Sequence, residues 1–356
     1  MSEAGLAMAG APRARRGLPL ARMALARLGS TLLVLFGVSI LIFCVARIMP
    51  GDPARIALGA NASAEQVAKL RAERHLDEPI LVQYGFFLRD LAQGDLGTSL
   101  YTRRPVTQDI ADYLPASLEL VFAAGIMMIV LGIPLGLVTA RYRGRMPDHI
   151  GRLVAVLAVC TPAFVWAVIL QLVFGYFWPV FPLEGRLAQG MPPPAGITGF
   201  FTLDALVRGD FATFRDAAWH LVLPAFALAL AGSGQTARLT RSSMIEIYRK
   251  PYVEMARAAG ISEMRIATRY AFRPALIPTL TILGLDFAAL LANAFLVERV
   301  FVWPGLSRYG VEVILRKDLD AIVGTVLIIA AIFLVTNLIV DVLVSLINPR
   351  IRLGRG

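Results

Sequence analysis

The chain has 356 residues, of which 57% are hydrophobic and only 17% are charged. Soluble domains carry about 25% charged residues, so this composition argues against a soluble protein. A net charge of +10 would suit a nucleic-acid-binding protein, but the distribution of the charge along the chain makes a nucleic-acid partner unnecessary.

Six long stretches of the sequence contain almost no charged residue. A helix needs roughly 20 apolar residues to cross a bilayer, and each stretch approaches or exceeds that length. A large soluble all-α core is the alternative, but buried helices of soluble proteins rarely run so long without a charge. The sequence therefore predicts six transmembrane helices, within Leu28–Ala46, Leu120–Ala140, Leu153–Leu183, Ala217–Ala237, Pro274–Val297 and Ala321–Val340.

Basic residues gather in the loops on one side of these six helices. If the N-terminus is cytoplasmic, the inside segments hold 20 Lys and Arg and five acids. The outside segments hold 15 Lys and Arg and 18 acids. The positive-inside rule then predicts that both termini lie in the cytoplasm. We therefore expect a multi-pass membrane protein in contact with lipid, and no nucleic-acid partner.

The N-terminal third predicts a tail, an anchor and a small lobe. Residues 1–22 form the cytoplasmic tail and residues 23–49 the first transmembrane helix, whose apolar run is too long for a signal peptide. Residues 50–116 are too many for a turn and predict an extracytoplasmic lobe. Within it, Ser63 and Gln66 fit a capping box, and Pro79 and Gly94 can start and stop a second helix. One face of that helix is expected to carry Ile80, Leu81, Tyr84, Phe87, Leu88 and Leu91.

Residues 117–350 form the expected transmembrane core, and its helices contain several residues that bend or closely pack helices. Pro134, Pro162 and Pro224 predict kinks, while Gly132 and Gly136 have the spacing that permits close helix packing in lipid. We expect ordinary bundle packing from these residues.

The positions of the cysteines and histidines predict neither a metal site nor a disulfide framework. Cys44 and Cys160 both fall within predicted spans and are expected to be small buried side chains. The three histidines (His75, His149 and His220) match no metal-ligand spacing. We therefore expect no metal site.

The sequence also lacks the motifs of an enzyme that hydrolyses ATP. A P-loop needs a Gly-Lys pair to hold phosphates, and none of the three lysines (Lys69, Lys250 and Lys317) follows a glycine. The predicted spans offer no catalytic pair either, which argues against an intramembrane enzyme. We therefore expect no ATP site and no cofactor in this chain.

The predicted cytoplasmic loop 238–273 reads as two short helices joined by a break. Pro251 suits a first helical position, and Glu254 near it favours the positive end of the helix dipole. Gly260 suits a left-handed stop, and Ser262 can cap the second helix. A slim charged helix on such a hairpin has the shape of a docking element, and a merely solvated amphipathic loop is the alternative.

The loop also resembles a known family. Glu254-Met255-Ala256-x-x-x-Gly260 looks like the EAA---G motif of ABC importer permeases, with Met255 at its second position. Other strings resemble, in order, the dipeptide/oligopeptide/nickel branch and specifically its first permease subunit, the dipeptide-permease B type. They are Pro50-Gly51-Asp52-Pro53, Leu76-Asp77-Glu78-Pro79, Gln83-Tyr84, Gly94-Asp95-Leu96-Gly97-x-Ser99, Pro105-Val106, Glu298-x-x-Phe301-x-Trp303-Pro304-Gly305-Leu306 and Asn348-Pro349-Arg350. The resemblance covers roughly residues 22–353, with departures at His75, where the family usually has Gly, and at Asp286, where relatives often carry Gln.

This resemblance implies an all-α type I importer permease fold in the bacterial inner membrane, which translocates di- or oligopeptides; nickel and glutathione importers are the alternatives. It implies three kinds of partner: a homologous second permease, two ATP-binding subunits or domains, and a periplasmic or lipid-anchored substrate-binding protein. The residues it implies in ATPase coupling are Glu254, Ala256, Arg257, Ala258, Gly260 and Glu263.

Two polar residues of the fifth predicted span are candidates for the substrate pathway. Asp286 and Asn293 are seven residues apart, so they share one helical face, and an ionisable residue inside a span is a functional candidate by default. Asp286 would favour a cationic group, such as a peptide amino terminus or a metal complex; an interhelical hydrogen bond is the alternative. A secondary transporter would need an ion-coupling site and usually internal repeats, and no inverted repeat is evident. A scaffold that only assembles other subunits is a further alternative.

Overall fold

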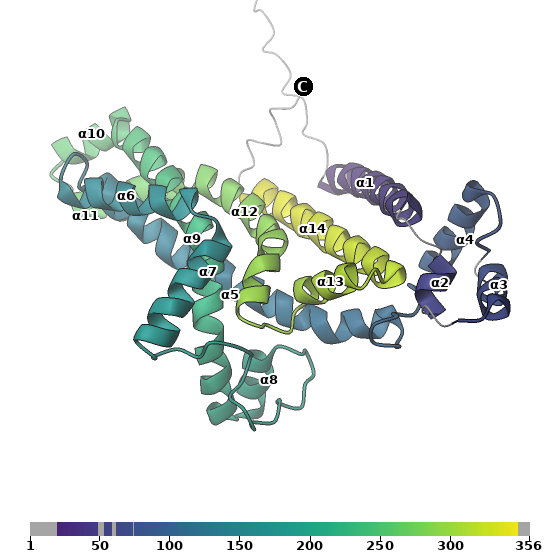
Figure 1. Ribbon diagram of the computed structural model, residues 1–356. Helices are drawn as coiled ribbons and strands as arrows, with labels where there is room; N and C mark the ends of the chain where they lie inside the picture. The colour runs from purple at the N-terminus through teal and green to yellow at the C-terminus, as the bar shows by residue number, and fades with distance from the viewer. Residues whose placement is uncertain (1–19, 49–52, 59–61, 74, 348–356) are drawn as a thin grey trace, which may run out of the picture.

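The computed structural model describes residues 20–48, 53–58, 62–73 and 75–347. This part of the chain is helical, and its one β-bridge joins Thr98 to Pro105. The tail and the strings at 50–52 and 348–350 lie outside the described residues. The elements are α1 (Leu20–Ile48), α2 (Pro53–Leu58), α3 (Ala64–Glu73), α4 (Ile80–Ala92), α5 (Val106–Arg141), α6 (Met146–Cys160), α7 (Ala163–Gln171), the π-helical η1 (Leu172–Phe177), α8 (Phe201–Arg208), α9 (Phe211–Tyr248), α10 (Pro251–Ala258), α11 (Glu263–Arg265), the π-helical η2 (Ile266–Ala271), α12 (Phe272–Val300), α13 (Leu306–Leu315) and α14 (Leu319–Ile347) (Figure 1).

Four described helices, α1, α5, α9 and α14, are long and apolar enough to cross a membrane. Two bent pairs pass the same test: α6 with α7 and η1, bent by 106°, and the helix Glu263–Phe287 with Ala289–Val300, bent by 48°. The described residues thus hold four straight spans, or six if each bent pair counts as one. The helical membrane fold predicted from the sequence is confirmed.

The predicted third span differs from the structure. Instead of one helix within Leu153–Leu183, the chain forms α6 from Met146 and then breaks at Thr161 and Pro162, both of which have extended backbone angles. A residue before proline is pushed out of the helical region, which explains the break at this point.

Helices α5 and α9 form the centre of the bundle and pack closely along each other (Figure 1). A Cβ built on Gly132 would come within 2.8 Å of the Ser233 carbonyl oxygen, and one on Gly136 within 2.7 Å of the Ala237 carbonyl oxygen. The predicted close packing through these glycines is therefore confirmed. Helix α12 packs against both α5 and α9, and α14 lies between α12 and α1.

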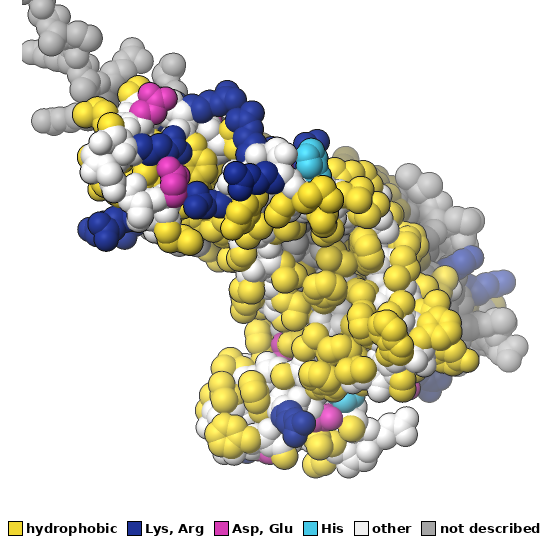
Figure 2. Space-filling model, turned by 90° about the vertical axis from the view of Figure 1, so that its left-hand side faces the viewer, with side chains coloured by type: hydrophobic (Ala, Val, Ile, Leu, Met, Phe, Trp, Pro, Cys, Tyr) yellow, Lys and Arg dark blue, Asp and Glu magenta, His cyan; other side chains and the backbone are white. Residues whose placement is uncertain are grey.

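The outside of the bundle is apolar, as a lipid-facing surface requires. Leu33 of α1 is 71% exposed and Ile126 of α5 is 62% exposed, and Figure 2 shows a broad hydrophobic area over the middle of the face in view. The two cysteines belong to this surface: Cys44 and Cys160 are free and exposed, so the prediction that they are buried was wrong. In lipid an apolar side chain gains nothing from being covered by protein, because the solvent is itself apolar.

Charged side chains gather at one end of the molecule, which we call the basic end. Figure 2 shows Lys and Arg concentrated there, over the part of the fold that carries α10 and the α5–α6 turn. The exposed basic residues include Arg141, Arg143, Arg145, Arg249, Lys250 and Arg257. The charge asymmetry inferred from the loops is therefore present in the fold.

The lobe predicted for residues 50–116 is shorter than expected, because α5 already begins at Val106. Its capping box is confirmed: the Gln66 backbone N–H donates to Ser63 Oγ at 3.2 Å, and the Ser63 N–H donates to Gln66 Oε1 at 3.0 Å. Gly94 ends the second helix with a φ of +78°, as predicted, whereas Pro79 precedes the helix as its N-cap.

The predicted apolar face of α4 is divided in the structure. Phe87 and Leu91 pack towards α1 and α14, and the Tyr84 hydroxyl is 2.8 Å from Ser39 Oγ of α1. Ile80 and Leu81, by contrast, are 56% and 81% exposed. The helix is therefore attached to the bundle by its central and last turns.

A buried carboxylate organises the connection between α12 and α13. Glu298 is fully buried, accepts a hydrogen bond from Ser117 Oγ of α5 and accepts another from the backbone N–H of Arg308 at 3.0 Å. Gly305 lies against this carboxylate, where a Cβ would come within 2.4 Å of Glu298 Oε2. The Glu298-to-Leu306 string is thus a structural joint that fixes the start of α13 on α5.

Candidate functional site

The structure folds residues 249–271 into a compact hairpin at the basic end. Helix α10 follows α9 after two residues, and Gly260 ends it with a φ of +75°, the left-handed stop predicted from the sequence. Ser262 occupies the N-cap position of α11, but its side chain makes no cap hydrogen bond, so that detail of the prediction was wrong. The hairpin has its own core of Val253, Ala256 and Ile266.

The residues implied in coupling divide into an outer and an inner set. Glu254, Arg257 and Ala258 are exposed on α10, whereas Ala256 is 6% exposed and packs inside the hairpin. Met255, which was not among the residues implied in coupling, is 72% exposed on the same helix. The outer surface of α10 therefore combines charge with an apolar side chain.

Glu263 ties the two halves of the hairpin to the bundle. Arg257 Nε donates to Glu263 Oε1 at 2.7 Å, and Arg141 Nη1, at the end of α5, lies 3.5 Å from Glu263 Oε2. These side chains are about 40% exposed, so each ion pair contributes little to stability. They connect α10 and the end of α5 to the same acid of the hairpin.

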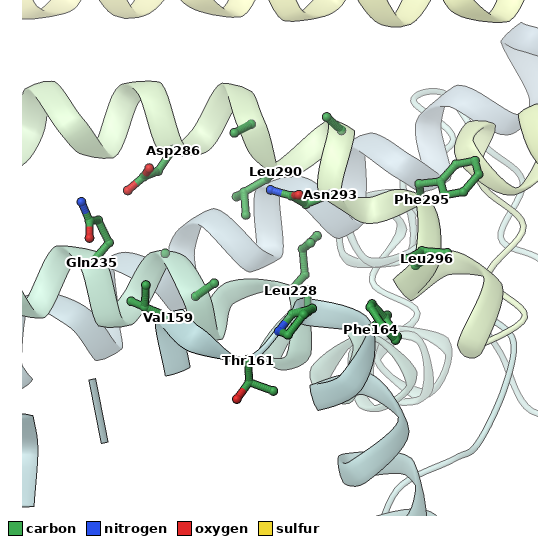
Figure 3. Close-up of a pocket in the computed structure, with 16 residues that line it drawn as sticks. Val159, Thr161, Phe164, Leu228, Gln235, Asp286, Leu290, Asn293, Phe295 and Leu296 are labelled. Atoms are coloured by element: carbon green, nitrogen blue, oxygen red, sulfur yellow. The ribbon is translucent and has the colours of Figure 1, made fainter. Parts of the chain in front are cut away.

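The second candidate site is a groove of about 570 Å³ between α9, α12 and the bend from α6 to α7. Figure 3 shows Gln235 of α9 and Asp286 of α12 pointing towards each other at one end, with Asn293 further along α12. Phe164, Phe295 and Leu296 line the other end. The structure therefore brings Asp286 and Asn293 into one groove, as their spacing predicted, and adds Gln235. The hairpin residues are not part of this groove.

The side chain next to Asp286 fixes the rotation of α12. The ring of Phe287 fills the space beside Gly125 of α5, where a Cβ would come within 2.4 Å of Phe287 Cε2. Gly284 lies equally close to Val340 of α14. Because successive helical residues point about 100° apart, contacts on these two sides direct Asp286 towards α9 and the groove.

Gln235 was missed because its sequence context carries no signal. It lies in an apolar run of α9 among Gly and Ser, and a single polar residue in such a span is usually a packing residue. Only the position of α12 relative to α9 shows that Gln235 faces an acid.

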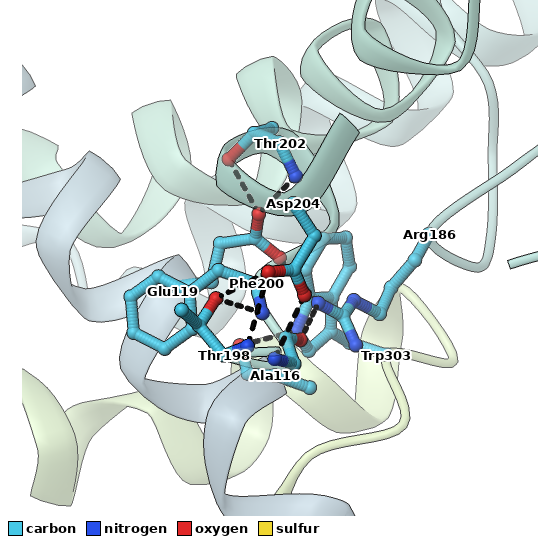
Figure 4. Close-up of polar contacts among 9 residues, drawn as sticks. Ala116, Glu119, Arg186, Thr198, Phe200, Thr202, Asp204 and Trp303 are labelled. Carbon is cyan, nitrogen blue, oxygen red and sulfur yellow. Dashed lines mark hydrogen bonds and ion pairs between the residues drawn. The ribbon is translucent and has the colours of Figure 1, made fainter. Parts of the chain in front are cut away.

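A polar cluster closes the opposite end of the bundle and holds the loop 184–200 (Figure 4). Arg186, which is 7% exposed, donates to Glu119 of α5 and to the Gly199 carbonyl oxygen at 2.8 Å. The Trp303 indole N–H donates to the Ala116 carbonyl oxygen at 2.9 Å. We call this cluster, with α8, the cap.

Asp204 organises the loop of the cap. Burial alone would raise its pKa, but hydrogen bonds donated by Thr198 and by the backbone N–H groups of Ile197 and Gly199 outweigh burial, and the pKa of Asp204 lies below its usual value. Burial lowers the pKa of Arg186, and the charge of Glu119 opposes that shift. The cap is thus a structural site held by ionised groups, separate from the groove.

Two family patterns match the chain. The family described as "Binding-protein-dependent transport system inner membrane component" matches residues 132–353. The family described as "Binding-prot-dependent transport system membrane comp, N-term" matches residues 20–121. Together they extend over the described bundle and the lobe.

Named relatives extend over nearly the whole chain. It is 40% identical over 325 residues to the probable D,D-dipeptide transport system permease protein DdpB of Escherichia coli (strain K12), covering 91% of this chain and 95% of the relative. It is 38% identical to the dipeptide transport system permease protein DppB of Alkalihalophilus pseudofirmus, covering 90% and 96%. It is 34% identical to the glutathione transport system permease protein GsiC of Salmonella choleraesuis, covering 88% and 94%. With the helical bundle and these matches, the chain belongs to the family of inner-membrane components of binding-protein-dependent transport systems.

Proposed function

We propose that this protein is the transmembrane permease subunit of an ATP-binding-cassette importer that moves dipeptides across the bacterial inner membrane. The observation that carries the proposal is the hairpin at the basic end. Its exposed Met255 and Met264 are covered by nothing in the described part of the chain, and exposed apolar side chains among charges suit a protein partner.

The hairpin would dock on an ATP-binding subunit. Glu254, Met255, Arg257 and Ala258 would make the contact, while Ala256, Gly260 and Glu263 would keep the hairpin rigid. This chain would carry no ATPase site, and ATP with Mg²⁺ would bind to two such partner subunits or domains. When the two ATP-binding partners close on each other, they would move α10. The ion pairs of Glu263 would pass this movement to α5.

The proposed orientation puts the basic end and both termini in the cytoplasm. Ile42, near the end of α1, packs with Val323, near the start of α14, so the two helices run in opposite directions. Val340, near the end of α14, contacts Gly284 in the first half of α12, which begins at the hairpin. The start of α1 and the end of α14 therefore both face the basic end, which supports an N-in, C-in arrangement.

The groove between α9 and α12 would form half of the substrate pathway, with Asp286 and Asn293 on its wall. A homologous second permease would complete the pathway. A soluble or lipid-anchored binding protein would deliver the peptide to the cap end. Dipeptides are the favoured substrate because the dipeptide permeases are the more similar relatives; glutathione is the second candidate, through the 34% identical relative.

The test is ATP-dependent transport by the complete assembly. The permease pair would be co-expressed with its ATP-binding subunits, reconstituted in liposomes and supplied with the binding protein. We expect dipeptides to stimulate ATP hydrolysis and to accumulate inside, in a panel that also contains longer peptides, glutathione and nickel. Stimulation by glutathione or nickel alone would replace the dipeptide assignment.

A charge reversal tests the docking role of the hairpin. Glu254→Arg is expected to abolish stimulated hydrolysis and to weaken co-purification of the ATP-binding subunits. Glu78→Arg makes the same change at an exposed position in the lobe and serves as the matched control. If no ATP-binding subunit co-purifies with the wild type and Glu254→Arg behaves like it, the docking role is wrong and a secondary transporter becomes the better explanation.

A further inference from the structure

Asp286 has a carboxyl oxygen that the protein leaves without a partner. Its Oδ2 is buried, and no hydrogen-bond donor reaches it among the described residues. Leaving a buried carboxylate oxygen unpaired is costly, so such an atom commonly indicates a ligand or a function. The alternative considered from the sequence, an interhelical hydrogen bond that uses up this oxygen, is not present in the described bundle.

The surroundings of Asp286 offer acceptors and no positive charge. None of the 16 residues that line the groove is Lys, Arg or His. Gln235 faces Asp286 from α9, and Asn293 lies about two turns along α12 (Figure 3). The remaining lining residues are apolar, small or hydroxyl-bearing. A group that enters between Asp286 and Gln235 therefore meets one carboxyl group and one side-chain amide.

Packing on the far side of α12 keeps the carboxylate at this place. Phe287 is seated beside Gly125, and Gly284 is pressed against Val340, so α12 cannot rotate without displacing α5 or α14. The 48° bend of the helix falls between Phe287 and Ala289, directly after Asp286. The acid is thus presented to the groove at a fixed point.

We propose that Asp286 is the counter-charge for the protonated α-amino group of the transported peptide, with the Gln235 side-chain oxygen as a second acceptor across the groove. This inference rests on the proposed function and adds the part of the substrate that this subunit contacts. An ammonium group carries three donors and no acceptor, which matches a carboxylate facing an amide oxygen. The carboxylate end of the peptide finds no cation in this groove, so its contacts would come from the second permease.

A metal ion fits this groove less well than an ammonium group. Nickel ions suit imidazole and other nitrogen ligands, whereas no His or Cys and a single acid line the groove. No cluster of three or more metal-binding side chains exists among the described residues. The chemistry of the groove therefore favours a peptide over nickel.

The experiment uses the complete transporter in liposomes, with uptake of radiolabelled Ala-Ala and ATP hydrolysis measured on the same preparation. Asp286→Asn keeps the size of the side chain and removes its charge. Since a hydrogen bond to a charged group is worth about a tenfold change in an equilibrium, we expect uptake to fall about tenfold or more. Hydrolysis stimulated by the binding protein should stay within about twofold of the wild type, because the hairpin is intact. Asp112→Asn, at an exposed acid outside the groove, should change neither quantity.

Moving the acidic side chain to the opposite wall of the groove distinguishes a substrate contact from a structural role. In the double variant Asp286→Asn with Gln235→Glu, the carboxylate and the amide exchange sides, and uptake should recover most of its loss. Two outcomes would overturn the inference in preparations whose stimulated hydrolysis is intact. One is normal uptake by Asp286→Asn, and the other is a loss of uptake that Gln235→Glu does not restore. A wild-type assembly without ATP-dependent uptake would instead overturn the proposed function itself.

Discussion

Gly136 of α5 lies against Thr240 of α9, so closely that a Cβ on the glycine would come within 2.5 Å of the threonine Cβ. Gly132 meets Thr236 in the same way one turn earlier, at 2.7 Å. The two central helices approach each other this closely because neither glycine has a side chain.

We predict that Gly136→Ala destabilises the bundle. The added methyl would also collide with the Ala237 carbonyl oxygen, a backbone atom that cannot move unless α9 shifts. Overpacking of this kind costs about 1–3 kcal/mol, which should appear as a lower thermal unfolding temperature and a lower yield of the purified permease. Gly37→Ala on α1 is the control, since nothing lies within 4 Å of its Cβ. Equal losses in both variants would contradict the packing argument.

We predict a strong effect at the buried joint between α12 and α13. Glu298→Ala would leave the Ser117 hydroxyl and the Arg308 N–H without their acceptor, and each such buried group costs about 1–3 kcal/mol. Glu298→Gln keeps one acceptor oxygen and should lose less. Thermal unfolding of both variants, combined with Ser117→Ala in a double-mutant cycle, measures the coupling. Additive effects of Glu298→Ala and Ser117→Ala would show that the two side chains do not stabilise each other.

His75 should tolerate glycine better than alanine. It has a φ of +50°, a left-handed conformation that costs a non-glycine residue about 1–2 kcal/mol, and its ring stacks on Phe86 at 3.9 Å. His75→Gly loses the stacking but removes the strain, whereas His75→Ala loses the stacking and keeps the strain. Thermal unfolding should therefore rank His75→Ala as the less stable variant. The reverse order would show that the backbone at this position is not strained.

The cap should loosen in acid. Because the pKa of Asp204 is lower in the folded protein than in the unfolded chain, its contribution to stability is present above the unfolded pKa of about 4 and is lost as the pH falls through the folded value. Hydrogen exchange of residues 197–204 should thus increase, after correction for the intrinsic rate, as the pH is lowered below about 4. In Asp204→Asn the exchange should be faster at neutral pH and should change less with pH. An unchanged pH response in that variant would assign the effect to other groups.

Much of the fold was predictable because bilayer thickness and helix geometry leave few alternatives. The apolar windows, the Ser63 capping box and the left-handed stop at Gly260 depend on neighbours in the sequence. The structure has four straight spans and two bent helix pairs, together with the capping box and the stop. A kink was predicted at Pro162, but its size, a 106° bend between α6 and α7, depends on how α7 packs on α9. The exposure of the two cysteines was mispredicted because a lipid-facing surface inverts the usual rule for apolar residues.

Only part of the candidate site could be predicted from the sequence, because the rest depends on how the helices pack. Asp286 and Asn293 could be paired from their spacing on one helix, but their alignment with Gln235 depends on the contact between Phe287 and Gly125. In the hairpin, the motif residue Ala256 was grouped with the contact residues, and only the folded hairpin shows that its side chain faces inward.

Helix α9 runs without interruption from the cap to the hairpin, over 38 residues. At 1.5 Å per residue its length is about 57 Å, nearly twice the thickness of the hydrocarbon core. The helix stays continuous through Pro224, and if it moves as one body, a tilt of about 5° imposed at the hairpin displaces the far end by about 5 Å relative to a fixed near end. A partner in the cytoplasm could therefore loosen or tighten the cap mechanically, with no ligand passing between the two ends.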